Sequence, residues 1–198
     1  MSALPLLVAL GGLYAAGVLR VRRPWPRWRS AAWAAGLVAL GAALAGPVDA
    51  GADRRLADHM VQHLLLTGPA PLLLAAAAPV RLALAASGPA GRRRVAGVLR
   101  SRAGRLAGRP AVALPAAVAV LVGFHLTGLF ALALEHPLVH AAEHAALFWT
   151  ALVAWVVLLG VDPLTHTPGV IGRLAWLTAL MTAMAVVGAV LVSADHVL

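Results

Sequence analysis

Apolar runs separated by short polar segments follow one another along the whole chain. As helices rising about 1.5 Å per residue, most of these runs are long enough to cross the roughly 30 Å hydrocarbon core of a bilayer. The pattern predicts six such helices, over residues 3–19, 31–46, 56–78, 111–134, 137–160 and 173–194. We therefore expect an all-α fold, a polytopic membrane protein in which residues 1–198 form a single six-transmembrane-helix bundle.

Composition agrees with a membrane-embedded chain. Of the 198 residues, 62% are hydrophobic and only 12% are charged, and the mean hydropathy is +0.88. A soluble domain of this size would be about 45–50% apolar and about 25% charged. The chain has no cysteine, which excludes disulfides, thiolate metal ligands and thiol redox chemistry.

Prolines and arginines modify this picture in two places. Pro69 and Pro71 lie inside the predicted helix 56–78, and because proline removes a backbone donor, we expect a kink there. Residues 81–109 carry eight arginines and several glycines and form the one long linker. Part of this linker is expected to form an amphipathic helix that lies on anionic lipid.

The basic residues, all of them arginine, predict the orientation of the chain in the membrane. Five of the 16 lie in residues 20–30, eight in residues 81–109 and one at Arg173, whereas only Arg54 and Arg55 lie elsewhere. Because cytoplasmic loops are enriched in basic residues, we expect these three segments inside and both termini extracytoplasmic. The first apolar run has its charges after it, so we expect a retained helix and not a cleaved signal peptide.

The net charge of +9 would suggest nucleic-acid binding in a soluble protein. Here no basic cluster is interleaved with exposed aromatic residues, so no nucleic-acid partner is expected. Topology and contact with the lipid bilayer explain the arginines instead.

Histidines recur at helical spacing at the start of two predicted helices. The helix 137–160 opens with three of them at four-residue intervals and an acid beside the last, namely His136, His140, His144 and Glu143. The helix 56–78 repeats the spacing after an acid, with Asp58, His59 and His63. Residues four apart lie on one face of a helix, about 6 Å apart along its axis. Titratable groups on apolar helices are costly in lipid and therefore indicate a function.

The predicted orientation brings these groups, and His125 of a third helix, to a similar depth on the outer side of the membrane. Imidazole is a common ligand of zinc, copper, iron and nickel. We expect a metal site with four histidines as direct ligands, His59, His63, His140 and His144. Further candidate ligands are His125 and His136, and the acids expected to orient the imidazoles are Glu143 and Asp58.

Thioether sulfur favours copper as Cu(I), and Met60 lies beside His59, so copper is one candidate metal. Zinc, iron and haem stay open as alternatives, since imidazole and carboxylate do not distinguish them from copper. Within the first cluster, His140, His144 and Glu143 form the expected working unit. Pro137 places His136 at the mouth of the helix, where metal would enter or leave.

Other functions fit the same residues. They are a histidine-box di-metal membrane enzyme, a haem-binding electron carrier with axial histidines from two helices, and a proton relay. The sequence shows no activated nucleophile and no oxyanion hole, so the protein is not expected to be an enzyme.

Two stretches of sequence resemble a known family. The first is Asp58-His59-Met60-Val61-Gln62-His63, followed by a proline-bearing apolar run that ends in Ala78-Pro79-Val80-Arg81. The second is Phe124-His125, then His136-Pro137-Leu138-Val139-His140, Glu143-His144 and Phe148-Trp149. In order and spacing they resemble the CtaG-like, multi-pass cytochrome c oxidase assembly factors of bacteria, over roughly residues 58–163.

The resemblance implies a bacterial plasma-membrane protein that is needed to make a haem–copper oxidase and that handles copper. Its partner would be a cytochrome c oxidase subunit, and a homo-oligomer stays possible. Longer relatives continue with a further helix that bears an Asp-Gln pair, whereas this sequence ends at Leu198. Asp195 and His196 are candidates to serve in place of that pair.

Overall fold

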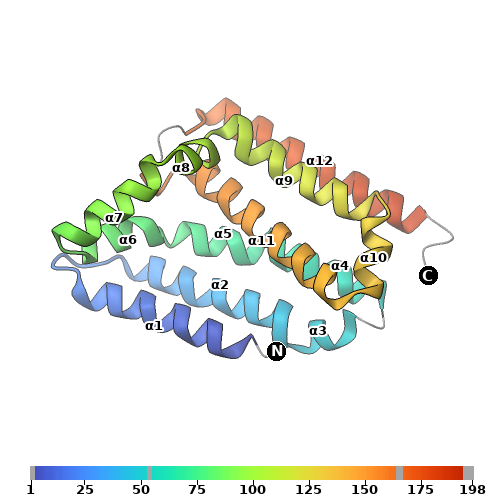
Figure 1. Cartoon of the computed structure of the whole chain (residues 1–198), viewed down its shortest axis with the longest axis horizontal. Coiled ribbons are helices and arrows are strands. Elements are labelled where there is room, and N and C mark those ends of the chain that lie inside the picture. Colours follow the sequence, from blue (N-terminus) through green and yellow to red (C-terminus); the bar gives the residue numbers. More distant parts are fainter. Residues whose placement is uncertain (1–2, 53–54, 164–166, 194–198) are drawn as a thin grey trace.

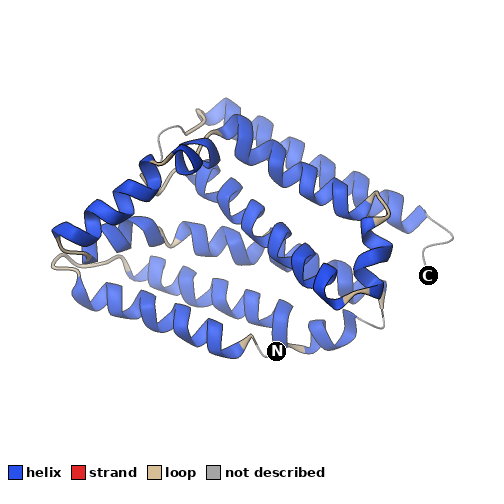
Figure 2. Cartoon of the chain, viewed as in Figure 1, coloured by secondary structure: helices blue, strands red, loops and turns tan. Residues whose placement is uncertain are grey.

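The computed structural model describes residues 3–52, 55–163 and 167–193, and these residues form helices and short connections, with no strand among them (Figure 2). The helices are α1 (Leu4–Arg20), α2 (Arg27–Ala45), α3 (Pro47–Ala52), α4 (Leu56–Thr67), α5 (Pro69–Ala76), α6 (Pro79–Ala86), α7 (Pro89–Arg100), α8 (Arg102–Ala107), α9 (Pro110–His125), α10 (Leu129–Glu135), α11 (Pro137–Leu159) and α12 (Val170–Ser193). Proline is the first residue of six of them, because its missing N–H is not needed in the first helical turn. The all-α prediction is confirmed for the described residues.

Four helical segments are long and apolar enough to cross a membrane, namely Arg27–Ala52, Ala57–Ala86, Pro137–Leu159 and Val170–Val190. Together α9 and α10 would make a fifth, but they are bent by 66° at their junction. The helix α1 is apolar and shorter, with 17 residues. The described chain is therefore that of a multi-pass membrane protein with four or five candidate spans, where the sequence pattern predicts six.

The prediction of one continuous helix over 111–134 is wrong. The helix stops at His125 and resumes at Leu129 as α10, which lies across the end of the molecule (Figure 1). The hydroxyl of Thr127 donates to the carbonyl oxygen of Gly123 and accepts a hydrogen bond from the N–H of Leu129. Such side-chain bonds replace helical ones and favour a break.

The expected kink in 56–78 is present as a break at Gly68, between α4 and α5. Because Pro71 has no N–H, the carbonyl of Thr67 has no partner four residues on. The indole N–H of Trp155, on α11, donates to this carbonyl at 2.9 Å. The carbonyl oxygen that Pro71 leaves unpaired thus accepts a hydrogen bond from a neighbouring helix.

The long helices pack in a curved row, in the order α1, α2, α4 with α5, α11, α9 and α12 (Figure 1). Helix α11 packs against α4 and α5 on one side and against α9 on the other. Its last turn ends at Gly160, which adopts the left-handed conformation (φ 61°) common at helix C-termini. The two halves of the row of helices therefore pack mainly against opposite sides of α11.

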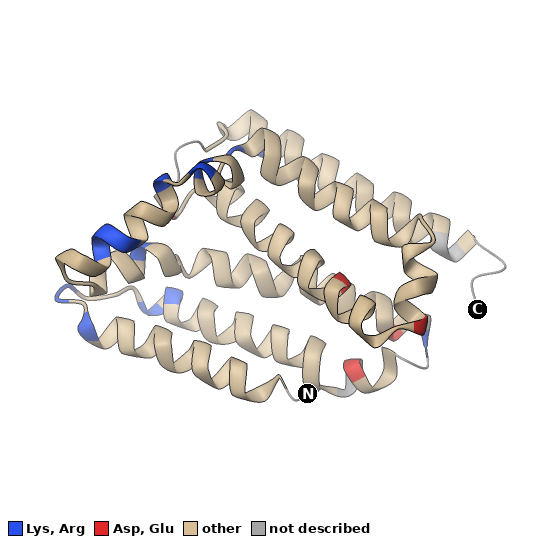
Figure 3. Cartoon of the chain, in the orientation of Figure 1, with Lys and Arg blue, Asp and Glu red and all other residues tan. Residues whose placement is uncertain are grey.

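Residues 81–109, expected to be a linker with an amphipathic helix in part of it, are largely helical and form most of α6 together with α7 and α8. Figure 3 shows the arginines gathered at this end of the molecule and at the turn between α1 and α2, with the acids mostly at the opposite end. An exception is Asp162, whose buried carboxylate accepts hydrogen bonds from the N–H groups of Val80 and Arg81. Burial raises the pKa of Asp162, and these two hydrogen bonds oppose the rise.

Small residues allow α2 and α5 to approach closely, as is common between membrane helices. Their contact contains Leu40, Ala43, Ala70 and Leu74, all of them buried. At Gly36 an added Cβ would lie 2.8 Å from Cγ of Leu74 and 3.1 Å from its backbone nitrogen.

We therefore expect Gly36→Ala to destabilise the fold by about 1–3 kcal/mol, because the backbone of α5 would have to move away. The measurement is the midpoint of thermal denaturation in detergent, which should fall. Gly12→Ala on α1 is the matched control, since a Cβ there meets nothing within 4 Å. Equal midpoints for the two variants would contradict the close contact.

Candidate metal centre

Four ligand atoms from α4 and α11 come together in the interior. They belong to His59, His63, His140 and Glu143, and all lie within 4.8 Å of one another. The side chains of His59, His63 and Glu143 are 1%, 4% and 0% exposed. Imidazole and carboxylate in this number and closeness fit one transition-metal ion.

The sequence spacing produces this convergence. On α4 the two histidines are four residues apart, and on α11 His140 and Glu143 are three apart, so each pair shares one helix face. The two helices pack against each other. Their polar stripes therefore face one another, and the next turns carry buried leucines, Leu66 and Leu147.

The imidazole rings of the two helices are in contact. The ring centroids of His59 and His140 lie 5.2 Å apart, with ring planes 16° apart. His63 and His144 have the same centroid distance, 5.2 Å, and are nearly perpendicular at 88°. His144 also lies 4.2 Å from His140. It thus borders the four-residue group without being part of it.

Several nitrogen and oxygen atoms of this cluster have no hydrogen-bond partner within the described part of the chain. They are Nε2 of His63, His140 and His144 and both carboxylate oxygens of Glu143, all of them buried. Burying a polar atom without a partner costs about 1–3 kcal/mol, and more for a charged group. Unpaired nitrogen and oxygen atoms that are concentrated in one place therefore indicate that a ligand binds there.

His125, the last residue of α9, orients His63. Its Nδ1 lies 2.8 Å from the carbonyl oxygen of Leu121 and donates to it, because a carbonyl only accepts. In neutral His125 the other nitrogen, Nε2, is then an acceptor, and it takes a 2.7 Å hydrogen bond from Nδ1 of His63. The lone pair of neutral His63 therefore lies on Nε2, the atom 4.0 Å from Oε1 of Glu143.

His125 was expected as a candidate ligand. In the structure it lies outside the four-residue group and is hydrogen-bonded to His63, a member of that group. Both of its ring nitrogens are engaged, one with the backbone and one with His63. A partner that holds the far nitrogen of a ligating histidine is a common feature of metal sites, where it fixes the tautomer and the ring orientation.

Two other predicted site residues lie apart from the group. His136 is exposed and is the N-cap residue of α11. Asp58 lies against α3, where a Cβ added to Gly51 would collide with its carboxylate. Neighbouring residues on a helix point about 100° apart, so Asp58 and His59 face different sides of α4. Asp195 and His196 lie outside the described residues.

Two residues that the sequence did not single out hold the cluster in place. Gln62 is fully buried, and its Nε2 donates to the carbonyl of Ala43 at 2.6 Å and to Oδ1 of Asp49 at 3.0 Å. The sequence could have indicated Gln62, because it is an amide on a largely apolar helix. Phe130 of α10 covers His59 and His125, with centroid distances of 5.7 and 5.9 Å. A phenylalanine in an apolar run carries no such signal.

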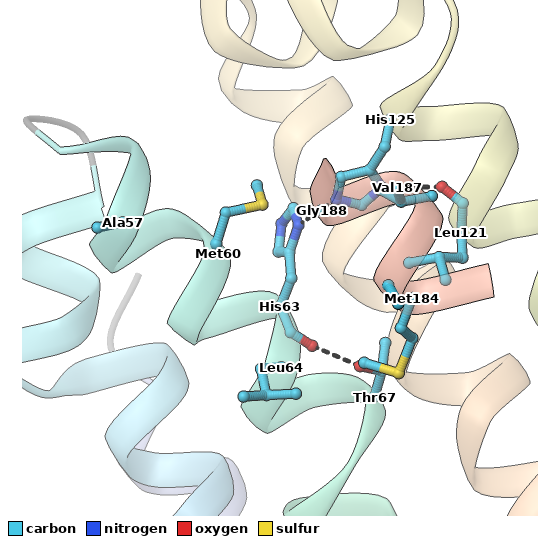
Figure 4. Close-up of a pocket in the computed structure, with 11 residues that line it drawn as sticks. Ala57, Met60, His63, Leu64, Thr67, Leu121, His125, Met184, Val187 and Gly188 are labelled. Carbon is cyan, nitrogen blue, oxygen red and sulfur yellow. Dashed lines mark hydrogen bonds between the residues drawn. The ribbon is translucent and has the colours of Figure 1, made fainter. Parts of the chain in front are cut away.

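A cavity of about 650 Å³ adjoins the cluster between α4, α9 and α12 (Figure 4). His63 and His125 line it, with Met60 and Met184 among otherwise mainly apolar residues. In Figure 4 the sulfur of Met60 points toward the ring of His63. Soft sulfur donors thus lie beside the histidine cluster.

Substituting His125→Phe should weaken metal binding about 10–100-fold, the usual effect of losing the partner that orients a ligating histidine. The phenyl ring fills the space but cannot accept from Nδ1 of His63. The measurement is competition titration of the purified protein against a chelator of known affinity. His136→Phe, at an exposed position, should leave the affinity unchanged. Unaltered binding by His125→Phe would show that the His63–His125 bond does not serve the site.

Comparison with known families identifies the family of the chain. The sequence profile of the cytochrome c oxidase caa3 assembly factor family (Caa3_CtaG) matches residues 12–198, nearly the whole chain. No curated protein and no solved structure matches the chain. The match confirms the resemblance seen in the histidine motifs, and the chain belongs to the caa3 assembly factor family.

Proposed function

We propose that this caa3 assembly factor binds copper, as Cu(I), in the His59–His63–His140–Glu143 group and delivers it to a subunit of the haem–copper oxidase. The observation that carries the proposal is the convergence of four buried ligand atoms within 4.8 Å. Oxidases of this class need copper inserted during assembly, and an assembly factor with a buried histidine cluster has the donor atoms to supply it.

The charge of the group favours a monovalent ion. The three imidazoles are neutral ligands, and Glu143 contributes one negative charge when ionised. Cu(I) would then give a neutral site, whereas Zn(II) would leave one positive charge in an apolar interior. Burying an uncompensated charge is costly, so this ligand set selects for Cu(I) through its net charge.

The arrangement also favours transfer over permanent retention. Histidines follow one another along α11 from the exposed His136 to His140 in the group and His144 beside it. Each step is one helical turn, about 6 Å. An ion could therefore exchange one imidazole at a time, and no covalent step is needed. His136 would serve where copper enters or leaves.

The other candidate functions have less support. The rings of His59, His63, His140 and His144 have centroids 4.2–6.4 Å apart, which leaves no slot for a haem between them. The described residues contain one group of four ligands, whereas a di-metal enzyme needs ligands for two ions. An assembly factor also needs no turnover.

For the membrane arrangement we propose six spans in the bacterial plasma membrane, with α1 as the first, α9 with α10 as one bent span, and both termini outside. The arginine-rich end of Figure 3 would then lie in the cytoplasm. The metal group would lie in the outer half of the bilayer, on the side where copper would be delivered.

The copper proposal predicts that purified protein binds one Cu(I) and that His63→Ala weakens binding by more than the roughly 10–100-fold cost of losing an orienting partner. The measurements are element-resolved metal content, an optical spectrum and Cu(I) competition titration. His136→Ala should bind as the parent does. Equal binding by His63→Ala, or a Soret band or two bound iron atoms in the parent, would overturn the proposal.

The orientation predicts opposite labelling of single cysteines, which the cysteine-free chain allows without background. Glu135→Cys, at the exposed end of α10, should react with a membrane-impermeant maleimide in intact cells. Ser101→Cys, between α7 and α8, should react only after the membrane is opened. The reverse pattern would invert the topology, and equal labelling would contradict the assignment of sides.

A further inference from the structure

A second cavity, of about 820 Å³, lies at the arginine-rich end of the molecule, away from the histidine cluster. One wall is the turn between α1 and α2, residues 20–26, and the other is the region where α6 meets α7, residues 81–92. These walls come from segments about 60 residues apart in the sequence, so the cavity exists only in the folded chain.

Five arginines line this cavity, and no acidic residue does. They are Arg20, Arg22, Arg23, Arg81 and Arg92. Within the described part of the chain, no carboxylate lies within 4.0 Å of any of these guanidinium groups. The nearby Asp162 directs its carboxylate to the N–H groups of Val80 and Arg81 and does not line the cavity. Asp162 interacts electrostatically with Arg81, so the described acids offset only part of the charge of the five guanidinium groups that line the cavity.

The wall of the cavity is held by hydrogen bonds. The indole N–H of Trp25 donates to the hydroxyl of Tyr14 at 2.9 Å, and this hydroxyl donates to the carbonyl of Ala77 at 3.0 Å. The Tyr14 ring stacks on Trp33 at 4.5 Å. On the opposite wall, Nε of Arg92 donates to the carbonyl of Ser87 at 2.9 Å. These bonds hold the α1–α2 turn and the side chain of Arg92 before any ligand binds.

We infer that this cavity binds the phosphate of an anionic phospholipid headgroup. Guanidinium groups form paired hydrogen bonds to phosphate oxygens, and basic pockets at the ends of membrane helices are suited to such headgroups. The bound phosphate would supply the missing counter-charge and link the α1–α2 turn to the start of α7.

The surroundings favour a lipid over a soluble phosphate. Leu19 of α1 is 86% exposed and directly precedes Arg20. Acyl chains could lie on this apolar surface while the headgroup occupies the cavity. Trp25 lines the same cavity, and tryptophan is enriched at the level of lipid headgroups.

The test compares binding of phosphatidylglycerol and phosphatidylcholine to the delipidated full-length protein, by native mass spectrometry from a neutral detergent. The parent should prefer phosphatidylglycerol by at least about tenfold, and Arg22→Gln/Arg81→Gln/Arg92→Gln should lose most of this preference. The matched control is Arg93→Gln/Arg94→Gln/Arg100→Gln, which removes the same charge from α7 outside the cavity. This control should keep the preference.

Three results would overturn the inference. The parent could show no preference for the anionic lipid, or both triple variants could lose it equally, which would indicate diffuse charge attraction. Inorganic phosphate could displace the lipid at matched concentration, which would indicate a site for a soluble anion. Unchanged Cu(I) binding and helical circular dichroism in both variants show that the fold is intact, so a lost preference then belongs to the cavity.

Discussion

A polar side chain inside an apolar helix bundle must find its partner within the protein, and this constraint governs the centre of the molecule. The hydrogen bond from His63 to His125 satisfies this constraint between α4 and α9, and α11 packs against both of these helices. Gln62 meets the same requirement toward α2 and α3. Gln62 and His63 are consecutive residues of α4. One short helix therefore ties its polar groups to three neighbours, and the unpaired atoms that are left converge on one point.

Spacing alone predicted much of this site, because helical periodicity is a local property. The four-residue intervals selected His59, His63, His140 and His144 as direct ligands. The structure brings the first three together with Glu143, which was predicted as an orienting acid, and places His144 beside the group. The separation of Asp58 from this group follows from the 100° between successive helix residues, but its contact with α3 depends on tertiary packing. The role of His125 was not predictable, because it depends on where α9 ends and on which nitrogen faces Leu121.

The same division holds for the fold. The apolar runs predicted the long helices, and Pro137 correctly marked the start of α11. The junction of α9 and α10 was missed, because the hydroxyl of Thr127 interrupts a run whose hydropathy is unbroken. The arginine-rich stretch was expected to be a linker with an amphipathic helix in only part of it, because its high charge hides the further short helices that form in the folded chain.

The hydrogen bond from Trp155 to Thr67 has a consequence for the depth at which the two ligand-bearing helices meet. It joins α11 to α4 about four turns from His140 and one turn from His63. Sliding one helix past the other by a single residue would shift its donor atoms by about 1.5 Å. That is a large part of the 4.8 Å within which the four ligand atoms lie. A carbonyl left free by Pro71 thus helps to set the axial register of the metal group from one helical turn beyond His63.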